Sequence, residues 1–215
     1  DSQEKAIGIT ANLVFFELEL NNLAEDKIAA VQADPVLGTY SVWLGQLARW
    51  RPYQLSEDME TLLQEKSSTG SGAWNRLFDE TMAEMRFPMN GKELTSAEVL
   101  NMLSSTDRAK RKAAGESIGA TLGSNKRLFA QITNTLAKDK AIEDKWRGYA
   151  KPISSRNLAN QVEDEVVEAL ITAVRDAYPD LSHRYYGLKA KWFGSDKLDY
   201  YDRNAPLPDS DNRMI

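Results

Sequence analysis

The chain contains one histidine, His183, and this is the first residue whose type suggests catalysis or metal binding. A zinc site built without cysteine needs several histidine or carboxylate ligands that converge on one point, and the 215 residues contain no cysteine. A Ser-His-Asp arrangement remains formally open. The neighbouring Arg184, Tyr185 and Tyr186 instead predict a helix surface packed by aromatic rings, so a structural role for His183 is favoured.

Asp139 and Glu143 form a second candidate pair, because residues four apart share one face of a helix. That face is otherwise apolar, so both carboxylates are expected to point inward. One interpretation is a metal or general-base site of the kind found in helical di-iron bundles, although those need Glu-x-x-His units that this chain lacks. The favoured interpretation is an ion pair with an inward arginine, for example Arg147 or Arg156, since buried charges need partners.

A polar stretch over residues 148–160 is a third candidate. Arg156, Asn157 and Asn160 supply hydrogen-bond donors and acceptors close to Tyr149. Polar loops on helical scaffolds often contact ligands, but their side chains more often cap helices, and Ser154 or Ser155 could do so here. Helix capping is therefore the favoured role, and ligand contact is the alternative.

The charge pattern and the hydropathy of the chain exclude several classes of protein. The formal net charge is -5, and the only dense basic triplet is Lys110, Arg111 and Lys112, which surface solvation explains. A nucleic-acid partner is therefore not expected. Apolar runs such as Leu13–Phe16 are far too short to span a bilayer, so no membrane partner is expected. The absence of cysteine fits a cytoplasmic protein.

The elements that must position these residues are mainly helical. Apolar residues recur at helical spacing over residues 3–23, and a helix is predicted behind the Asp34-Pro35 cap. Further helices are predicted over residues 125–147, 163–177 and 180–193. Gly115 and Gly119 lie inside a predicted helix that begins after Thr106, which indicates the close approach of a neighbouring helix, and Gly123 is a candidate for its carboxy-terminal cap. Pro179 is expected to separate the last two helices.

Residues 86–94 are expected to break the helical pattern. Asn90-Gly91 is the pair that a two-residue type I′ turn requires, because both positions need positive φ. Thr95 and Glu98 then have the spacing of a capping box at the start of a helix. The predicted fold class is therefore mainly α, a multi-helix array with one short β-hairpin near residues 86–94.

Several stretches together resemble the amino-terminal half of the oligoendopeptidase F family, zinc metallopeptidases related to thimet oligopeptidase. In the family's order, they are "FFELELNNL" (15–23), "EKSSTGSGAWNRLFDETMAEMRF" (65–87), "NTLAKDKAIEDKWRGY" (134–149), "SSRNLANQVEDEVVEAL" (154–170), "HRYYGLKAKWFG" (183–194) and "YYDRNAPLP" (200–208). Each stretch alone is weak, but six in order span nearly the whole chain.

The resemblance implies a mainly helical protein with a long cleft between two lobes. In the family, a zinc ion deep in the cleft is held by the two histidines of a His-Glu-x-x-His helix and by a further glutamate, and the motif's glutamate activates the zinc-bound water. The cleft admits short peptides. With one histidine, this chain has no such motif, so no catalytic, cofactor-binding or metal-ligating residue is assigned in it.

The resemblance therefore predicts an amino-terminal fragment of a cytoplasmic zinc oligopeptidase. We expect residues 1–90 to form the family's amino-terminal helical domain and residues 91–215 to begin the peptidase module. This piece would form part of the cleft wall and be inactive alone, with zinc and oligopeptide substrates bound only by the complete protein. Apolar surface exposed near residues 180–215 would drive self-association. The alternative is a self-standing helical protein-interaction domain.

Overall fold

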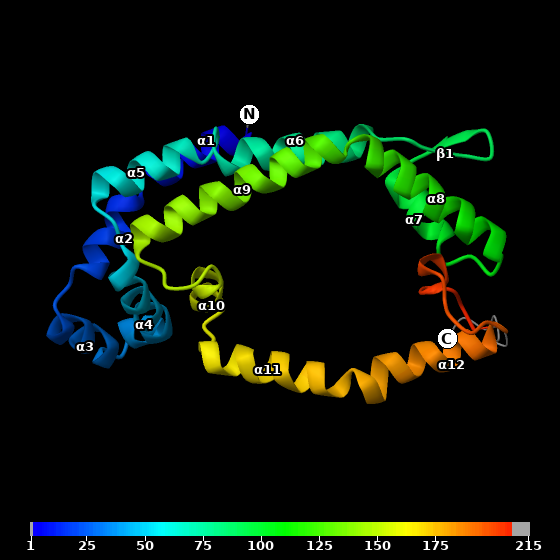
Figure 1. Cartoon of the computed structure of the whole chain (residues 1–215). Coiled ribbons are helices and arrows are strands. Elements are labelled where there is room, and N and C mark those ends of the chain that lie inside the picture. The colour runs from blue at the N-terminus through cyan, green and yellow to red at the C-terminus, as the bar shows by residue number, and fades with distance from the viewer. Residues whose placement is uncertain (1, 208–215) are drawn as a thin grey trace. The chain divides into compact units, whose positions relative to one another are not determined.

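The computed structural model describes residues 2–207, with side chains from residue 5 onward, and this part of the chain is mainly helical (Figure 1). The predicted fold class, a mainly α array with one short hairpin near residues 86–94, is confirmed. The described residues form two compact units. Unit 1 comprises the residues up to Arg76 and Thr133–Glu168, and unit 2 comprises Leu77–Ile132 and the residues from Ala169 onward.

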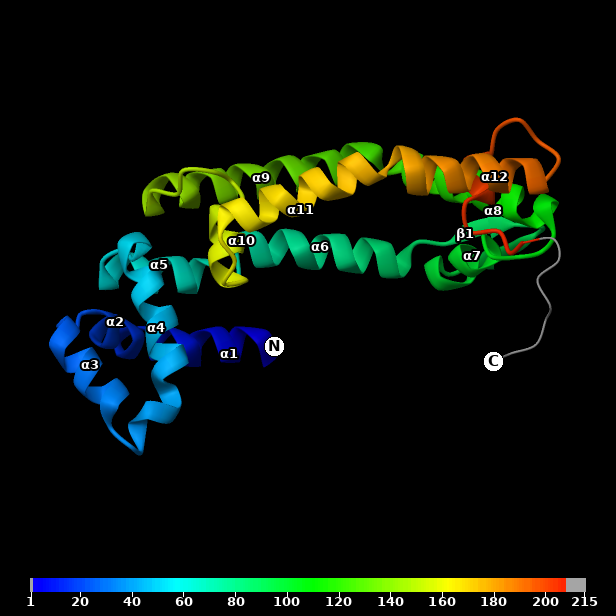
Figure 2. The same ribbon diagram turned by 90° about the horizontal axis from the view of Figure 1, so that it is seen from below.

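Unit 1 is built mainly from short helices at the beginning of the chain. These are α1 (Ser2–Ala11), α2 (Val14–Asn21), α3 (Glu25–Ala33), η1 (Leu37–Tyr40), α4 (Ser41–Trp50), η2 (Arg51–Tyr53) and α5 (Glu57–Lys66). Helices α1 and α2 contact α5, and α4 contacts α2 and α3. Figures 1 and 2 both show α2, α3 and α4 gathered together. The later part of unit 1 contains the end of α9 (Lys126–Arg147) and the short α10 (Ser154–Ala159).

Two details of unit 1 differ from the sequence-based expectation. The helix predicted over residues 3–23 is divided into α1 and α2, and just before the break the Thr10 hydroxyl donates to the carbonyl of Ala6 at 2.9 Å. Such bonds compete with the helical hydrogen-bond ladder. Asp34 does act as a cap, but its Oδ1 accepts from the Val36 N–H at 2.7 Å and the Leu37 N–H at 2.9 Å, so it caps η1.

The core of unit 2 lies around the hairpin and the helices that follow it. Its buried residues are Met85, Phe87, Val99 and Ala114. Fully burying a side chain such as Phe87 contributes about 2 kcal/mol. The surrounding helices are the end of α6 (Ser71–Glu84), α7 (Ser96–Met102) and α8 (Arg108–Ser124). Strand β1 packs on α8, which also contacts α7, and Figure 1 shows α7 and α8 side by side.

The hairpin forms at the predicted place for the predicted reason. Strands β1 (Phe87–Met89) and β2 (Lys92–Leu94) pair antiparallel, with Asn90 and Gly91 between them at φ 54° and 74°. The capping box also forms, because Thr95 Oγ1 accepts from the Glu98 N–H and Glu98 Oε2 accepts from the Thr95 N–H at 2.8 Å. Together these local interactions lead the chain from α6 into α7.

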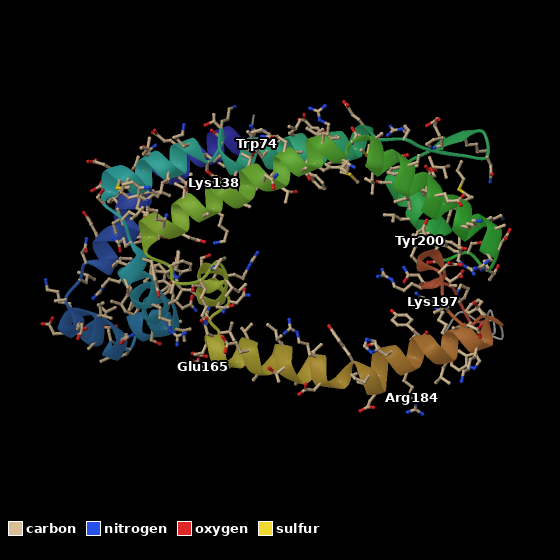
Figure 3. The ribbon with its side chains drawn as sticks, in the orientation of Figure 1. Trp74, Lys138, Glu165, Arg184, Lys197 and Tyr200 are labelled. Atoms are coloured by element: carbon tan, nitrogen blue, oxygen red, sulfur yellow. The ribbon has the colours of Figure 1, made fainter. Side chains whose placement is uncertain are left out.

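The glycines of α8 only partly match the prediction. The ring of Tyr200 lies over Gly115, and a Cβ there would meet its Cε2 at 2.9 Å, so Gly115 does allow a close approach. The approaching element is η4 (Tyr200–Asp202), a 3₁₀ turn beside α8 in which Figure 3 labels Tyr200. At Gly119 a Cβ would meet nothing within 4 Å, so the prediction is wrong there. Gly123 lies inside α8, which ends at Ser124 and is capped by Asn125.

Pro179 does not separate the last two helices as predicted. Helix α11 (Asp164–Ala177) continues through a π-helical turn, η3 (Pro179–His183), into α12 (Arg184–Trp192). The N–H of His183 donates to the carbonyl of Tyr178 at 2.9 Å, a bond that spans five residues. Proline is tolerated in the first turn of a helical segment because its missing N–H is not needed there. The expectation that a proline ends the preceding helix is therefore wrong here, because the backbone hydrogen bonds continue through the π-helical turn.

The expected boundary at residue 90 rests on family resemblance and not on packing. The two compact units follow contacts, and each contains two separate parts of the chain. The division into residues 1–90 and 91–215 therefore stays a prediction. Among the described helices, none combines the length and the apolar character needed to cross a bilayer.

Candidate functional site

A cavity of about 990 Å³ lies within unit 1 and is a candidate binding site. Aromatic side chains from α4, from η2 and from the segment after α9 line it together with acidic groups of α5 and α9. They include Trp43, Trp50, Tyr53, Tyr149, Glu60, Asp139 and Glu143. Several members of the sequence-based candidate pair and loop therefore meet here. An apolar wall with a few convergent polar groups is the usual character of a small-molecule or peptide site.

Arg147 is the centre of the polar network on this cavity. Its guanidinium donates to both carboxylate oxygens of Glu60, at 2.7 and 2.9 Å, and its Nε donates to Glu143 Oε1 at 2.7 Å. A longer bond of 3.3 Å reaches the carbonyl of Tyr53. The bidentate geometry fixes the direction of both carboxylates, so Arg147 ties α9 to α5.

Burial and hydrogen bonding act in opposite directions on the Glu60 carboxyl. Burial raises its pKa, but the hydrogen bonds from Arg147 and from the Leu55 N–H outweigh burial and leave that pKa below the ordinary 4.5. The bond with Glu60 in turn raises the pKa of Arg147. Both groups are therefore charged near neutral pH, and neither is available as a proton donor or acceptor for catalysis.

Of the candidate pair Asp139 and Glu143, only Glu143 forms the ion pair predicted from the sequence. Glu143 pairs with Arg147, which is the favoured interpretation of the sequence, while Arg156 is exposed on α10. Asp139 lines the same cavity, but its side chain is exposed and not buried as expected. The apolar face of α9 continues to the exposed Ile142 and Trp146, so periodicity alone overstated the burial of the pair.

The loop over residues 148–160 makes structural contacts, but neither Ser154 nor Ser155 caps a helix as favoured from the sequence, because both lie inside α10, whose N-cap is Ile153 and has no side-chain hydrogen bond. The ring of Tyr149 stacks on Tyr53 with centroids 4.3 Å apart, and burial raises the pKa of Tyr149. Asn157 is buried and donates to Asp164 Oδ1 at 2.8 Å, at the start of α11. Ser155 Oγ accepts from Lys140 Nζ at 3.0 Å. These bonds join α10 to α9 and α11.

Two polar atoms near the cavity have no hydrogen-bond partner among the described residues. They are Asn21 Oδ1 and Gln54 Oε1, both buried and both on residues that line the cavity. A buried unpaired oxygen costs free energy, so its presence needs a reason. Both atoms are acceptors that the described side chains leave without a donor.

His183 lies on the surface and has the structural setting predicted for it. Its side chain is exposed, and its ring centroid lies 5.9 Å from that of Tyr178. The π-helical turn that contains it is held by its backbone N–H. No ion pair of His183 occurs in the structure over residues 2–207.

Arg111 is buried, so the interpretation of the basic triplet as solvated surface is wrong for this residue. Its side chain is only 1% exposed, and its Nη2 donates to Asp202 Oδ1 at 2.8 Å, while the Asp202 side chain is 3% exposed. Arg108 donates to the other carboxylate oxygen at 3.1 Å. The 3-residue spacing of Arg108 and Arg111 on one helix face was the available signal. This buried group holds η4 against α8.

Lys189 completes this buried group in unit 2. Its ammonium donates to the carbonyl of Arg203 at 2.7 Å, and burial lowers its pKa. The Phe193 ring lies within 6.0 Å of both the Lys189 ammonium and the Arg111 guanidinium. The segment "YYDRN", which contributed to the family resemblance, is therefore held by Arg111 and Lys189. The sequence alone did not indicate these partners.

The sequence also contains one catalytic pattern that has no catalytic setting in the structure. Gly-x-Ser-x-Gly occurs at Gly115–Gly119, with Ser117 as its central residue. The nucleophile elbow that this pattern marks requires a sharp turn from a strand into a helix. Ser117 instead lies in the middle of α8, where its Oγ is buried without a partner. The pattern therefore gives no support to a serine nucleophile.

The described residues do not fit a zinc ion. Within residues 2–207 no three histidine, aspartate or glutamate side chains come together as metal ligands, and the single histidine cannot form a His-Glu-x-x-His pair. Among the carboxylates that line the unit 1 cavity, Glu60 and Glu143 pair with Arg147, and Asp144 pairs with Lys140. No step of zinc chemistry is derived from these residues.

Comparison with known proteins shows which family this chain is similar to. The family model described as Oligopeptidase F matches residues 19–87. The chain is 30% identical over 204 residues to the Group B oligopeptidase PepB of Streptococcus agalactiae serotype III (strain NEM316), covering 92% of this chain and 34% of that protein. It is 28% identical over 210 residues to the oligopeptidase PepF of Bacillus subtilis (strain 168), covering 94% of this chain and 31% of that protein.

A solved structure gives the same result at the level of the fold. The oligoendopeptidase-F of Enterococcus faecium matches with a TM-score of 0.81 and 25% identity, covering 93% of this chain and 41% of that one. The resemblance to the oligoendopeptidase F family is therefore confirmed, for its amino-terminal portion. The chain spans about a third of the length of the curated relatives that it matches.

Proposed function

We propose that this chain is the amino-terminal portion of a zinc-dependent oligoendopeptidase that hydrolyses short peptides. The observation that carries the proposal is the similarity to two proteins named as oligopeptidases over more than nine-tenths of this chain. In the complete enzyme, this portion forms part of the wall of the substrate cleft. It supplies no catalytic group, and zinc is held by residues outside these 215.

The chemistry of the described residues supports this division of labour. Glu60 and Glu143 of the unit 1 cavity are held in ion pairs with Arg147, and the one histidine is an exposed residue of a π-helical turn. These ion pairs hold helices together. A peptidase that contains this chain would therefore need its metal ligands and its general base from residues outside these 215. A cytoplasmic location and oligopeptide substrates come with the same proposal, through the family that the chain resembles.

Exposed apolar side chains also support a portion that packs against more protein. Leu181, Leu188, Trp192 and Tyr200 are all exposed in unit 2. Exposed apolar surface of this kind commonly marks an interaction site. The sequence-based expectation of apolar surface near residues 180–215 agrees with these positions, and residues 208–215 lie outside the described part of the chain.

A peptidase assay tests the proposal in two arms. The 215-residue chain is incubated with zinc and a quenched fluorescent peptide, and a full-length protein that contains it is assayed in parallel. We expect no turnover by the chain alone and turnover that a chelator abolishes by the full-length protein. Chelator-sensitive turnover by the 215 residues alone would contradict the proposed division. An inactive full-length protein whose reading frame lacks His-Glu-x-x-His after Ile215 would contradict the peptidase assignment.

A further inference from the structure

The wall of the unit 1 cavity carries more negative than positive charge. Five acidic and two basic residues line it, namely Glu17, Glu60, Asp139, Glu143 and Asp144 against Lys140 and Arg147. The volume of about 990 Å³ lies at the upper end of the range for small-molecule sites. A cleft lined mainly by one sign of charge concentrates ligands of the opposite sign, so the cavity attracts cations.

Both basic side chains of the wall are already paired with carboxylates. Arg147 pairs with Glu60 and with Glu143, at 2.7 Å in each case. Lys140 donates to both carboxylate oxygens of Asp144, at 2.7 and 2.8 Å. The positive charges of the wall are therefore neutralised where they stand, and they do not exclude a further cation from the cavity.

Glu17 and Asp139 are the two carboxylates of the wall that remain. Both side chains are exposed, and neither carboxylate has a hydrogen bond or an ion pair with another described residue. Glu17 belongs to α2 and Asp139 to α9. Two elements of unit 1 thus each supply an accessible carboxylate that lacks a partner among the described residues.

Asn21 is a second, independent indication of a ligand. Its side chain lines the cavity, the residue is only 6% exposed, and its Oδ1 has no donor among the described residues. It follows Glu17 by four residues on α2, so the two side chains share a face of that helix. A buried oxygen without a donor costs free energy. A guanidinium or an ammonium carries several N–H donors, enough for a carboxylate and an amide oxygen together.

Aromatic rings supply the apolar part of the wall. Trp43 and Trp50 of α4 line the cavity, as do Tyr53 and Tyr149, whose rings stack with centroids 4.3 Å apart. The face of an aromatic ring attracts a cation, and the methylene chain that carries the cation packs against apolar surface. The wall therefore suits an occupant that combines a cationic head with an apolar stem.

Other kinds of occupant fit this wall less well. An anion would meet Glu17 and Asp139 with like charge, while both cations of the wall are already paired. An uncharged apolar occupant would displace water from the two carboxylates without replacing its hydrogen bonds, which costs free energy. A cation replaces those hydrogen bonds.

We propose that the unit 1 cavity binds an organic cation with an apolar stem, which is the chemistry of an arginine or lysine side chain. Glu17 and Asp139 attract the cationic head, Asn21 accepts one of its hydrogen bonds, and the rings of Trp43 and Trp50 pack on the stem. The cation belongs to a peptide or to a free amine or guanidine. The site uses residues of this chain alone, so the proposal goes beyond the role of a cleft wall and does not depend on it.

The charge of the occupant is tested with two alanine pentapeptides that have blocked ends. One has arginine at its centre, and the other has citrulline, which keeps the shape and lacks the charge. Two-dimensional ¹H–¹⁵N spectra of the 215-residue chain follow the indole N–H signals. We expect the arginine peptide to shift Trp43 and Trp50 but not Trp192 of unit 2, and to bind at least about tenfold more tightly than the citrulline peptide. Equal binding of the two peptides, or no shift at about 1 mM, would overturn the proposal.

A double variant locates the binding. Glu17→Gln combined with Asp139→Asn should lower the affinity for the arginine peptide to that for the citrulline peptide. Glu65→Gln combined with Asp79→Asn is the matched control, because it removes the same charge from exposed side chains that do not line the cavity. The control should bind within about twofold of the wild type. Equal weakening by both double variants would mean that the general charge of the chain attracts the peptide, and would also overturn the proposal.

The source of the cation is tested with n-propylguanidine, which is the arginine side chain without its peptide. If it binds as tightly as the arginine peptide, the cavity is a site for a free cation. If the peptide binds more tightly, the cavity is a site for a basic peptide. Both results support a cation site. Binding is measured without turnover, so its failure is separable from a failure of the peptidase assay.

Discussion

Arg147 shows how one side chain can settle the role of several others. Glu60 and Glu143 meet the same guanidinium, and both face a cavity that would otherwise suggest acid–base chemistry. Breaking such a half-buried pair costs roughly 1–3 kcal/mol, between the values for exposed and fully buried pairs. The network is therefore a structural clamp between α5 and α9.

The clamp predicts how stability depends on pH. The pKa of Glu60 is lower in the folded protein than its ordinary 4.5, so its contribution is complete above that value and is lost as the pH falls through the folded pKa. Glu60→Gln should be destabilised by roughly 1–3 kcal/mol at pH 7 and should lose less stability than the wild type between pH 5 and pH 3 (about 1 kcal/mol less). Urea unfolding followed by circular dichroism measures both.

Glu65→Gln is the control for that experiment, because it changes an exposed carboxylate on the same helix. It should match the wild type within about 0.5 kcal/mol. If Glu60→Gln and the wild type lost stability in parallel down to pH 3, the ion pair would not stabilise the fold.

At the scale of elements, η4 and α8 are fitted to each other by a glycine and a buried charge. The Tyr200 ring occupies the space over Gly115, and Asp202 pairs with Arg111 below it. Glycine destabilises a helix relative to alanine. At Gly115 the missing side chain leaves room for the contact with η4, which offsets this loss. At the exposed Gly119 no such contact offsets it.

The two glycines therefore predict opposite responses to one substitution. Gly119→Ala should stabilise the protein by about 0.5–1 kcal/mol through helix propensity. Gly115→Ala should be less stable than Gly119→Ala by at least about 1 kcal/mol, because the new methyl group displaces the Tyr200 ring. Equilibrium unfolding measures both, and the Tyr200→Ala background should abolish the difference. A difference that persists there would mean that Tyr200 is not the cause.

At the scale of the whole molecule, exposed apolar surface predicts the behaviour of the chain by itself. The side chains of Leu181, Leu188 and Trp192 in unit 2 are exposed, and exposed apolar surface promotes association. We expect the isolated 215-residue chain to form weak assemblies whose mass rises with concentration in light scattering.

Leu181→Ser is the test of where that association occurs. It should lower the average mass at a given concentration, whereas Val42→Ser should not, although both side chains are well exposed. A wild-type chain that remains monomeric at about 1 mM would contradict the prediction.

The local sequence determined the elements whose interactions span only a few residues. The type I′ turn at Asn90-Gly91 and the capping box of Thr95 and Glu98 follow from backbone preference and from bonds between residues three apart. The helices α9 and α11 follow from periodicity, and their bounds lie within about one residue of those expected. The family resemblance came from six ordered segments and required no coordinates.

Only the tertiary structure decided which side chains are paired and buried. Arg111 and Asp202 are 91 residues apart in the chain, and no periodicity marks one member of a basic triplet as buried. Glu60 and Arg147 are 87 residues apart, so the sequence could offer Arg147 as a partner of Glu143 but not of Glu60. Pro179 likewise became part of a continuous helix because a bond spanning five residues formed around it. Pairing and burial depend on which segments the fold brings together, and that information is not local.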